Sequence, residues 1–259
     1  MKMEKLMLAS NVKGDGRVLI LLHGLFGSSD NLGRIAKELS DDYQVHSLDL
    51  RNHGESFHSN LMSYDLMAQD VIRYLDENNL KCVNIMGHSM GGKVAMRIAL
   101  DYPERIQSLI VADIAPVTYT KHHEEIFKGL FAVDFERDRT RTGIDKVLAQ
   151  YIEAVGIRQF LLKNLKPNGK GDLRWKMNLS AIYENYPRIL EGLSNDDPFF
   201  GRVLFIAGGL SNYIKPAYKK QTLSLFPNTV MKVIPEATHW LHAEKPRAFI
   251  GICQRFLKA

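Results

Sequence analysis

Short runs of apolar residues alternate along this chain with longer segments in which apolar residues recur every three or four positions. Continuous apolar runs are typical of strands buried on both faces of a sheet, and helical spacing is typical of helices that pack on one side. The strand-like runs span residues 18–22, 45–50, 83–86, 109–112, 203–207 and 230–234, and the helical segments span residues 32–39, 64–75, 93–100, 218–226 and 246–256. We therefore expect an α/β fold with a mostly parallel sheet flanked by helices, and a weaker edge strand near residues 4–9.

The alternation stops between residues 117 and 198, where helical segments follow one another without a strand-like run. The clearest of them is residues 144–155, and Gly156 and residues 167–171 are expected to form turns between helices. An insertion late in a parallel sheet lies over the carboxyl ends of the strands, where ligands bind. We predict a core domain of residues 1–116 and 199–259, with residues 117–198 inserted as a helical cap.

Composition limits the class of protein. The chain has 259 residues, of which 45% are hydrophobic and 24% charged, as in globular proteins. The net charge is +5, but basic and acidic residues are interleaved, which argues against nucleic acid as a partner. No apolar stretch is long enough to span a membrane or to form a secretory signal, so we expect a cytoplasmic protein without stable membrane insertion. Cys82 and Cys253 lie among apolar residues and are expected to be buried thiols.

The most informative motif is Gly87-His88-Ser89-Met90-Gly91-Gly92, which stands where a strand-like run gives way to a helical pattern. A serine on a tight turn from strand to helix needs glycines on either side, because other side chains would collide with the adjacent backbone. Ser89 is therefore the candidate nucleophile. A glycine-rich turn with a surface serine is the alternative interpretation.

A serine hydroxyl needs a general base nearby, and the base needs an acid that orients it. His239 lies just beyond the last strand-like run and is the candidate base, with His242 as the competing choice. Ser211 follows the run 203–207, at a place where many enzymes with this motif carry an aspartate. Because a serine cannot stabilise an imidazolium ion as a carboxylate does, Asp113, at the end of the preceding run, is the candidate acid. Ser211 is then a candidate auxiliary group that hydrogen-bonds near this pair.

The remaining aspartates fit the role of acid less well. Asp196 and Asp197 precede a strand-like run, which places them at the opposite edge of the sheet, and Asp49 belongs to a segment that we interpret as an ion-paired structural turn. The negative oxygen of a tetrahedral intermediate needs two backbone donors. The amides of Leu25, after the first strand-like run, and Met90, after the candidate nucleophile, are expected to form this oxyanion hole.

Five motifs occur in order along the chain: His23-Gly24-Leu25-Phe26-Gly27, Asp49-x-Arg51-Asn52-His53-Gly54, Gly87-His88-Ser89-Met90-Gly91-Gly92-Lys93, Asp113-Ile114-Ala115-Pro116 and His239-Trp240-x-His242-Ala243-Glu244-Lys245-Pro246. With them the chain resembles the YbfF-type esterases of the α/β-hydrolase superfamily over nearly its whole length. That family hydrolyses carboxylic esters and acyl-CoA thioesters beneath a helical cap. It also has an acid in the place of Asp113 and a serine in the place of Ser211.

The resemblance implies acyl transfer from a small-molecule ester or thioester to water, through an acyl-enzyme on Ser89, with no metal or organic cofactor. A monomer or weak homodimer is expected. In the cap, Arg137, Arg139 and Arg141 either form a solvated surface or bind the phosphates of coenzyme A. Two alternatives stay open: a lyase or carbon-carbon hydrolase of the same fold, similar to the menaquinone-pathway synthase, and a non-catalytic ligand receptor.

Overall fold

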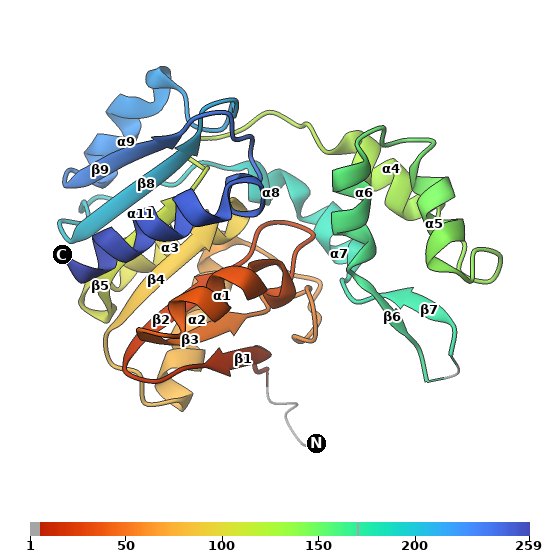
Figure 1. Cartoon of the computed structure of the whole chain (residues 1–259), viewed down its shortest axis with the longest axis horizontal. Helices are drawn as coiled ribbons and strands as arrows, with labels where there is room; N and C mark the ends of the chain where they lie inside the picture. Colours follow the sequence, from red (N-terminus) through yellow and green to blue (C-terminus); the bar gives the residue numbers. More distant parts are fainter. Residues whose placement is uncertain (1–5, 170) are drawn as a thin grey trace.

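A seven-stranded sheet forms the centre of the molecule, in the strand order β1-β3-β2-β4-β5-β8-β9 (Figure 1). The computed structural model describes residues 6–169 and 171–259. The strands are β1 (Ser10–Lys13), β2 (Arg17–Leu22), β3 (Tyr43–Leu48), β4 (Val83–His88), β5 (Ile106–Ala112), β8 (Arg202–Gly208) and β9 (Thr229–Ile234). β1 runs antiparallel to β3, and the other pairings in this sheet are parallel. The predicted mostly parallel sheet is therefore confirmed.

Helices cover both faces of the sheet (Figure 1). They are α1 (Gly33–Leu39), α2 (Tyr64–Glu77), α3 (Met90–Asp101), α9 (Lys219–Leu225), α10 (Leu241–Glu244) and α11 (Pro246–Lys258), with short 3₁₀ turns η1 (Ser29–Leu32), η2 (Pro103–Arg105) and η3 (Pro216–Tyr218). Successive side chains of β2 point to opposite faces. Leu19 and Leu21 pack with α1 and α11, whereas Ile20 and Leu22 pack with α2 and α3. This alternation explains why the central strands appear as unbroken apolar runs.

Three expectations about exposure and strand position are wrong. Strand β9 lies at the edge of the sheet and leaves Val230, Met231 and Val233 exposed, because it has a neighbouring strand on one side only. Cys82 is exposed, since it precedes β4, while Cys253 is buried as expected. The edge strand near the N-terminus begins at Ser10 instead of within residues 4–9, of which residues 4 and 5 lie outside the described part.

The segment between β5 and β8 contains α4 (Glu124–Ala132), α5 (Arg141–Leu148), α6 (Val155–Leu162), α7 (Leu179–Glu184) and α8 (Tyr186–Leu190), gathered at one side of the sheet (Figure 1). It also contains an antiparallel pair of strands, β6 (Leu165–Pro167) and β7 (Leu173–Trp175), which the sequence pattern did not predict. The expected helix 144–155 is broken into α5 and α6. At the break, the guanidinium of Arg158 binds the carbonyls of Ile152 and Glu153 and the carboxylate of Asp145, and so gives these carbonyls a partner outside a helix. Gly156 lies inside α6 and not in a turn.

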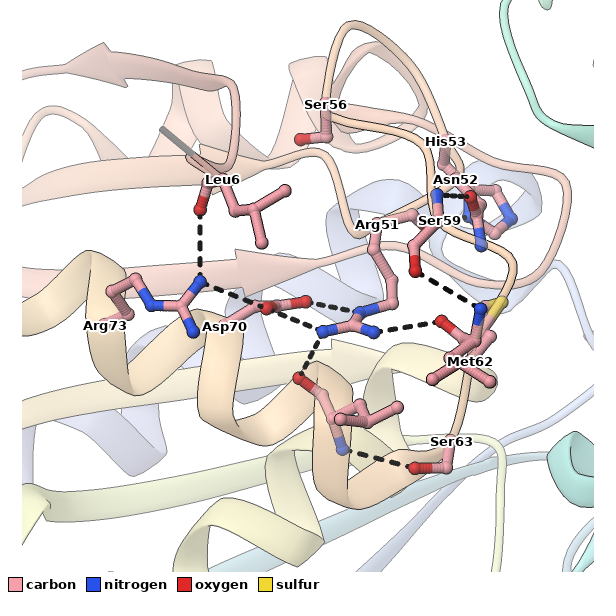
Figure 2. Close-up of polar contacts among 12 residues, drawn as sticks. Leu6, Arg51, Asn52, His53, Ser56, Ser59, Met62, Ser63, Asp70 and Arg73 are labelled. Carbon is pink, nitrogen blue, oxygen red and sulfur yellow. Dashed lines mark hydrogen bonds and ion pairs between the residues drawn. The ribbon is translucent and has the colours of Figure 1, made fainter. Parts of the chain in front are cut away.

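The loop after β3 is a rigid turn, as expected. Asp49 accepts hydrogen bonds from the amides of Ser29 and Glu55, at 2.6 and 2.9 Å. The ionic partner of Arg51 is Asp70 on α2, with Nε–Oδ2 at 2.5 Å and Nη2–Oδ1 at 2.8 Å, and the guanidinium also binds backbone carbonyls (Figure 2). Both side chains are buried. A bidentate ion pair of this kind fixes the loop against α2.

Lys93 on α3 connects the core to both ends of the inserted segment. It is completely buried, and its ammonium donates to the carbonyls of Val117 at 2.8 Å and Leu190 at 3.4 Å, and to that of Glu191. The ring of Tyr119 lies 4.9 Å from its Nζ. Burial lowers the pKa of Lys93 to about 7. Lys93 lies four residues after Ser89, and all its hydrogen bonds go to backbone carbonyls, so we interpret it as a structural residue.

Candidate active site

Ser89 stands on a sharp turn between β4 and α3, with φ 54° and ψ −121°. A non-glycine residue in this region is strained, so the surrounding structure must hold it there. The turn is tight enough that a Cβ on Gly87 would lie 2.1 Å from the carbonyl oxygen of Gly91, and a Cβ on Gly91 would lie 2.4 Å from that of Leu22. The glycines predicted to be necessary around Ser89 are therefore required by backbone contacts on both sides.

The structure brings Ser89, His239 and Asp113 together from three separate segments. His239 lies on the loop between β9 and α10, and its Nε2 is 2.9 Å from Ser89 Oγ. Its Nδ1 is 2.7 Å from Asp113 Oδ2. The carboxylate holds the proton on Nδ1, which leaves the lone pair of Nε2 directed at the serine hydroxyl. Three residues far apart in sequence thus form one continuous chain of hydrogen bonds.

Asp113 is fully buried directly after β5, where its own φ is 52°. Its Oδ1 accepts a hydrogen bond from the amide of Gly208, at 2.9 Å. Its Oδ2 accepts two hydrogen bonds, one from the Ser211 hydroxyl and one from Nδ1 of His239. Ser211 accepts in turn from the amide of Tyr213, at 3.2 Å. A buried carboxylate that accepts three hydrogen bonds is compensated for its loss of water and held in one orientation.

Sequence reasoning missed Tyr213. Its ring stacks on the imidazole of His239, with the ring centroids 3.8 Å apart and the planes inclined by 19°. Its hydroxyl bonds His122 Nε2, in the stretch that leads into α4. Tyr213 therefore touches His239, Ser211 and the inserted segment together. The only signal in the sequence was an aromatic residue two positions after Ser211.

His242, the competing base, forms no hydrogen bond with Ser89 or Asp113. It is 5% exposed, and its Nδ1 has no hydrogen-bond partner among the described residues. Burial lowers its pKa to about 4, so the ring is neutral. It packs against His88, with centroids 4.3 Å apart. His88 lies 2.9 Å, through its Nε2, from the carbonyl oxygen of His239, and so fixes the backbone of the loop that carries that residue.

The amides of Leu25 and Met90 both lie next to Ser89, and neither donates a hydrogen bond to an acceptor within residues 6–169 and 171–259. Met90 is the first residue of α3, where amides lack partners within the helix. The Leu25 loop is anchored by His23, which bonds the carbonyl of Gly24 at 2.8 Å and accepts from the amide of Leu50 at 3.0 Å. A Cβ on Gly24 would lie 3.2 Å from that of Ser89, so glycine permits this close approach.

Two cavities meet at His239, and the inner one also contains Ser89. The inner cavity, of about 250 Å³, is lined by Ser89 together with mostly apolar side chains that include Phe26, Ile126 and Phe160. The outer groove, of about 760 Å³, shares His239 with the inner cavity but extends past polar residues to the surface. A small cavity of about 30 Å³ adjoins Ser89 on the side of Met90. The arginines at 137, 139 and 141 line none of these three spaces, so the structure does not bring them to the site.

Across residues 6–169 and 171–259, no three His, Cys, Asp or Glu side chains converge as a metal site. Within the same ranges, no helix has the length and apolar character needed to cross a membrane. The expected compartment and oligomeric state stay predictions.

Similarity to known proteins defines the class of this protein. A model of the alpha/beta hydrolase fold matches residues 17–246, which is most of the chain, and the chain belongs to this family. It is similar to esterase YbfF of Escherichia coli (strain K12), with 38% identity over 240 residues that cover 92% of each protein. It is also similar to the sn-1-specific diacylglycerol lipase ABHD11 of Mus musculus, with 36% identity over 247 residues that cover 92% of this chain and 80% of that protein.

Among solved structures, the chain resembles a marine microorganism esterase with a TM-score of 0.95 and 42% identity, covering 97% of this chain and all of that one. The family match and these relatives confirm the predicted fold, the resemblance to YbfF-type esterases and the prediction of an enzyme that hydrolyses carboxylic esters. The roles of individual residues and the extent of the cap rest on geometry alone.

Proposed function

We propose that this protein is a serine esterase that forms an acyl-enzyme on Ser89. The observation that carries the proposal is the continuous chain from Asp113 through His239 to Ser89, with distances of 2.7 and 2.9 Å. As Ser89 Oγ attacks the ester carbonyl carbon, Nε2 of His239 takes the hydroxyl proton and then delivers it to the leaving alcohol oxygen. A water molecule, deprotonated by the same nitrogen, then hydrolyses the acyl-enzyme.

The oxyanion of the tetrahedral intermediate would be stabilised by the amides of Leu25 and Met90. Both are free to donate and border the space beside Ser89 Oγ. Backbone donors held in a fixed position contribute several kcal/mol, about 3 for one donor, because they need no reorganisation as charge develops. Asp113 would stabilise the imidazolium ion of His239, and Ser211 would hold Asp113 in place through its hydroxyl.

We further propose that residues 117–198 form a cap on a core of residues 1–116 and 199–259. The inner cavity supports this division, because one side of it is formed by Ile126, Ile157 and Phe160 of the inserted segment and the other by core residues around Ser89. Its volume lies below the range of about 300–1,000 Å³ that is typical of drug-sized ligand pockets. A short acyl group would fit the inner cavity, and the leaving alcohol would occupy the outer groove, which His239 borders.

Carboxylic esters are favoured over acyl-CoA thioesters by the position of the cap arginines. A coenzyme A group in the outer groove would need several cations for its phosphates, whereas Lys163 borders this groove and the three cap arginines lie elsewhere. The lyase and receptor alternatives are less favoured, because both dispense with an acylated serine, whereas Ser89 is hydrogen-bonded to a base that is itself oriented by a buried carboxylate.

Labelling with a fluorophosphonate probe, read by intact mass, tests the proposal. We expect one adduct on the wild-type protein and none on Ser89→Ala. His242→Gln serves as a matched control, because His242 lies nearby without contacting Ser89, and it should still be labelled. A folded wild-type protein that gives no adduct would refute the acyl-enzyme and favour the alternatives. A panel of short and long acyl esters and thioesters then defines the substrate range.

A further inference from the structure

His123 lies beside Ser89 and has no role in the mechanism proposed above. It directly precedes α4, and its side chain borders both the inner cavity and the small cavity of about 30 Å³. Ser89 and Leu25 border the same two cavities. An acyl group attached to Ser89 would therefore occupy space that His123 faces. The edge-on contact of His123 with Phe26, whose ring centroid is 5.8 Å away, makes it a polar group in a largely apolar wall.

The hydrogen bonds around His123 fix the position of its proton. The amide of His122 donates to Tyr186 Oη at 3.3 Å, and Tyr186 Oη lies 2.8 Å from His123 Nδ1. Because the described residues offer the Tyr186 hydroxyl no other acceptor, it donates to Nδ1. Burial lowers the pKa of His123 to about 3, so the ring is neutral. A neutral imidazole that accepts at Nδ1 carries its proton on Nε2.

This Nε2–H group has no acceptor in the part of the chain that the structure describes. The nitrogen is not sealed from solvent, and the side chain that carries it lines the inner cavity, so the donor is available to a group bound there. A purely apolar acyl chain would exclude water from this donor and leave it unpaired, which disfavours binding. An acyl group with an oxygen at this place would satisfy the donor. The small cavity, with room for about two water-sized groups, accommodates such a substituent.

His123 faces the acyl side of the ester and not the alcohol side. The general acid must reach the leaving oxygen, so the alcohol lies toward His239 and the outer groove. His123 does not line that groove. Lys93, a buried lysine that also borders the small cavity, is already bound to three carbonyl oxygens. The donor therefore suits an uncharged oxygen better than a carboxylate.

We propose that His123 is a specificity-determining residue whose Nε2–H donates a hydrogen bond to a hydroxyl or keto oxygen on the acyl group. Preferred substrates are then esters of short hydroxy or oxo acids. This inference rests on the proposed acylation of Ser89, because that acylation places the acyl group in the two inner cavities. No covalent step is added to the reaction, and the residue acts only in binding.

Two esters that differ in one hydroxyl group test the inference: 4-nitrophenyl butyrate and 4-nitrophenyl 3-hydroxybutyrate. We expect the wild-type kcat/KM to favour the hydroxy ester. In His123→Phe the ratio of the two kcat/KM values should fall about tenfold, the effect of one lost hydrogen bond. The value for the hydroxy ester should fall, and the value for the plain ester should not, because its acyl chain no longer leaves a donor unpaired. His123→Gln, which retains an N–H donor, should recover part of the ratio. Ile126→Val, a cavity change without a donor, should affect both esters equally.

The outcomes separate this inference from the function on which it rests. A ratio that His123→Phe leaves unchanged overturns the specificity proposal, as does an equal fall for both esters, which would indicate a structural role. Hydrolysis of the plain ester and labelling of Ser89 report on the esterase itself. If the wild-type protein neither hydrolyses the plain ester nor is labelled at Ser89, the proposed function fails, and the specificity proposal fails with it.

Discussion

Buried neutral histidines make the folded state sensitive to acid. Burial lowers the pKa of His53 to about 3 and that of His242 to about 4, from 6.5. Below pH 6.5 the unfolded chain binds protons that the folded state does not, so the free energy of unfolding falls as the pH falls. At pH 5 each ring removes about 2 kcal/mol, and the two together about 4 kcal/mol. Burial lowers the pKa of His23 and His88 in the same direction and adds to the loss.

Urea unfolding measured at about pH 8 and about pH 5 tests this expectation. The free energy of unfolding should be lower by about 4 kcal/mol or more at pH 5, which is a large part of the roughly 5–15 kcal/mol of a typical domain. His242→Leu removes one titrating ring without breaking a hydrogen bond, since none is found for its ring within the described residues. It should reduce the pH-dependent loss by about 2 kcal/mol. His58→Gln, at an exposed position, is the control. A stability that is constant to within about 1 kcal/mol over this range would refute the reasoning.

Three further expectations concern the site and its framework. Asp113→Asn should lower kcat for a nitrophenyl ester by about 10⁴-fold, because asparagine holds the wrong imidazole tautomer. Ser211→Ala should lower kcat by about 10- to 100-fold, and the reverse ranking would contradict the assignment of Asp113 as the acid. Gly87→Ala should abolish folding, as judged by thermal unfolding, while Gly33→Ala, where nothing lies within 4 Å, should leave Tm unchanged or higher. Lys93→Met should lower the free energy of unfolding by about 3 kcal/mol in urea, because carbonyls in both crossing segments lose their donor; an unchanged midpoint would show that they do not depend on it.

The sheet and the three central site residues were readable from the sequence because each depends on local rules. A strand buried on both faces must be apolar throughout, and parallel strands bring the residues that follow them to one edge. Ser89, Asp113 and His239 each follow a strand, so their convergence follows from the order of elements. Ser211 follows β8, the next strand of the sheet, and lies beside Asp113 for the same reason.

The features that escaped prediction depend on contacts between distant segments. At the break between α5 and α6, Arg158 binds carbonyls that a continuous helix would have used internally, a contact that helical spacing alone does not reveal. The exposure of β9 depends on its place at the edge of the sheet, which the chain order alone does not reveal. Tyr213 and His123 became candidates only when the structure placed one on His239 and the other beside Ser89.

Placing the acid at the end of β5 has a mechanical consequence. Asp113 is four residues from Val117, where we place the start of the inserted segment and whose carbonyl accepts a hydrogen bond from Lys93. The start of the insertion and the carboxylate that bonds His239 therefore share one short stretch of chain. The loop after β8 has no carboxylate to supply, so its side chains are free to pack on the imidazole, as Tyr213 does. A change in the position of the insertion would therefore reach Asp113, and through it His239, along a short stretch of backbone.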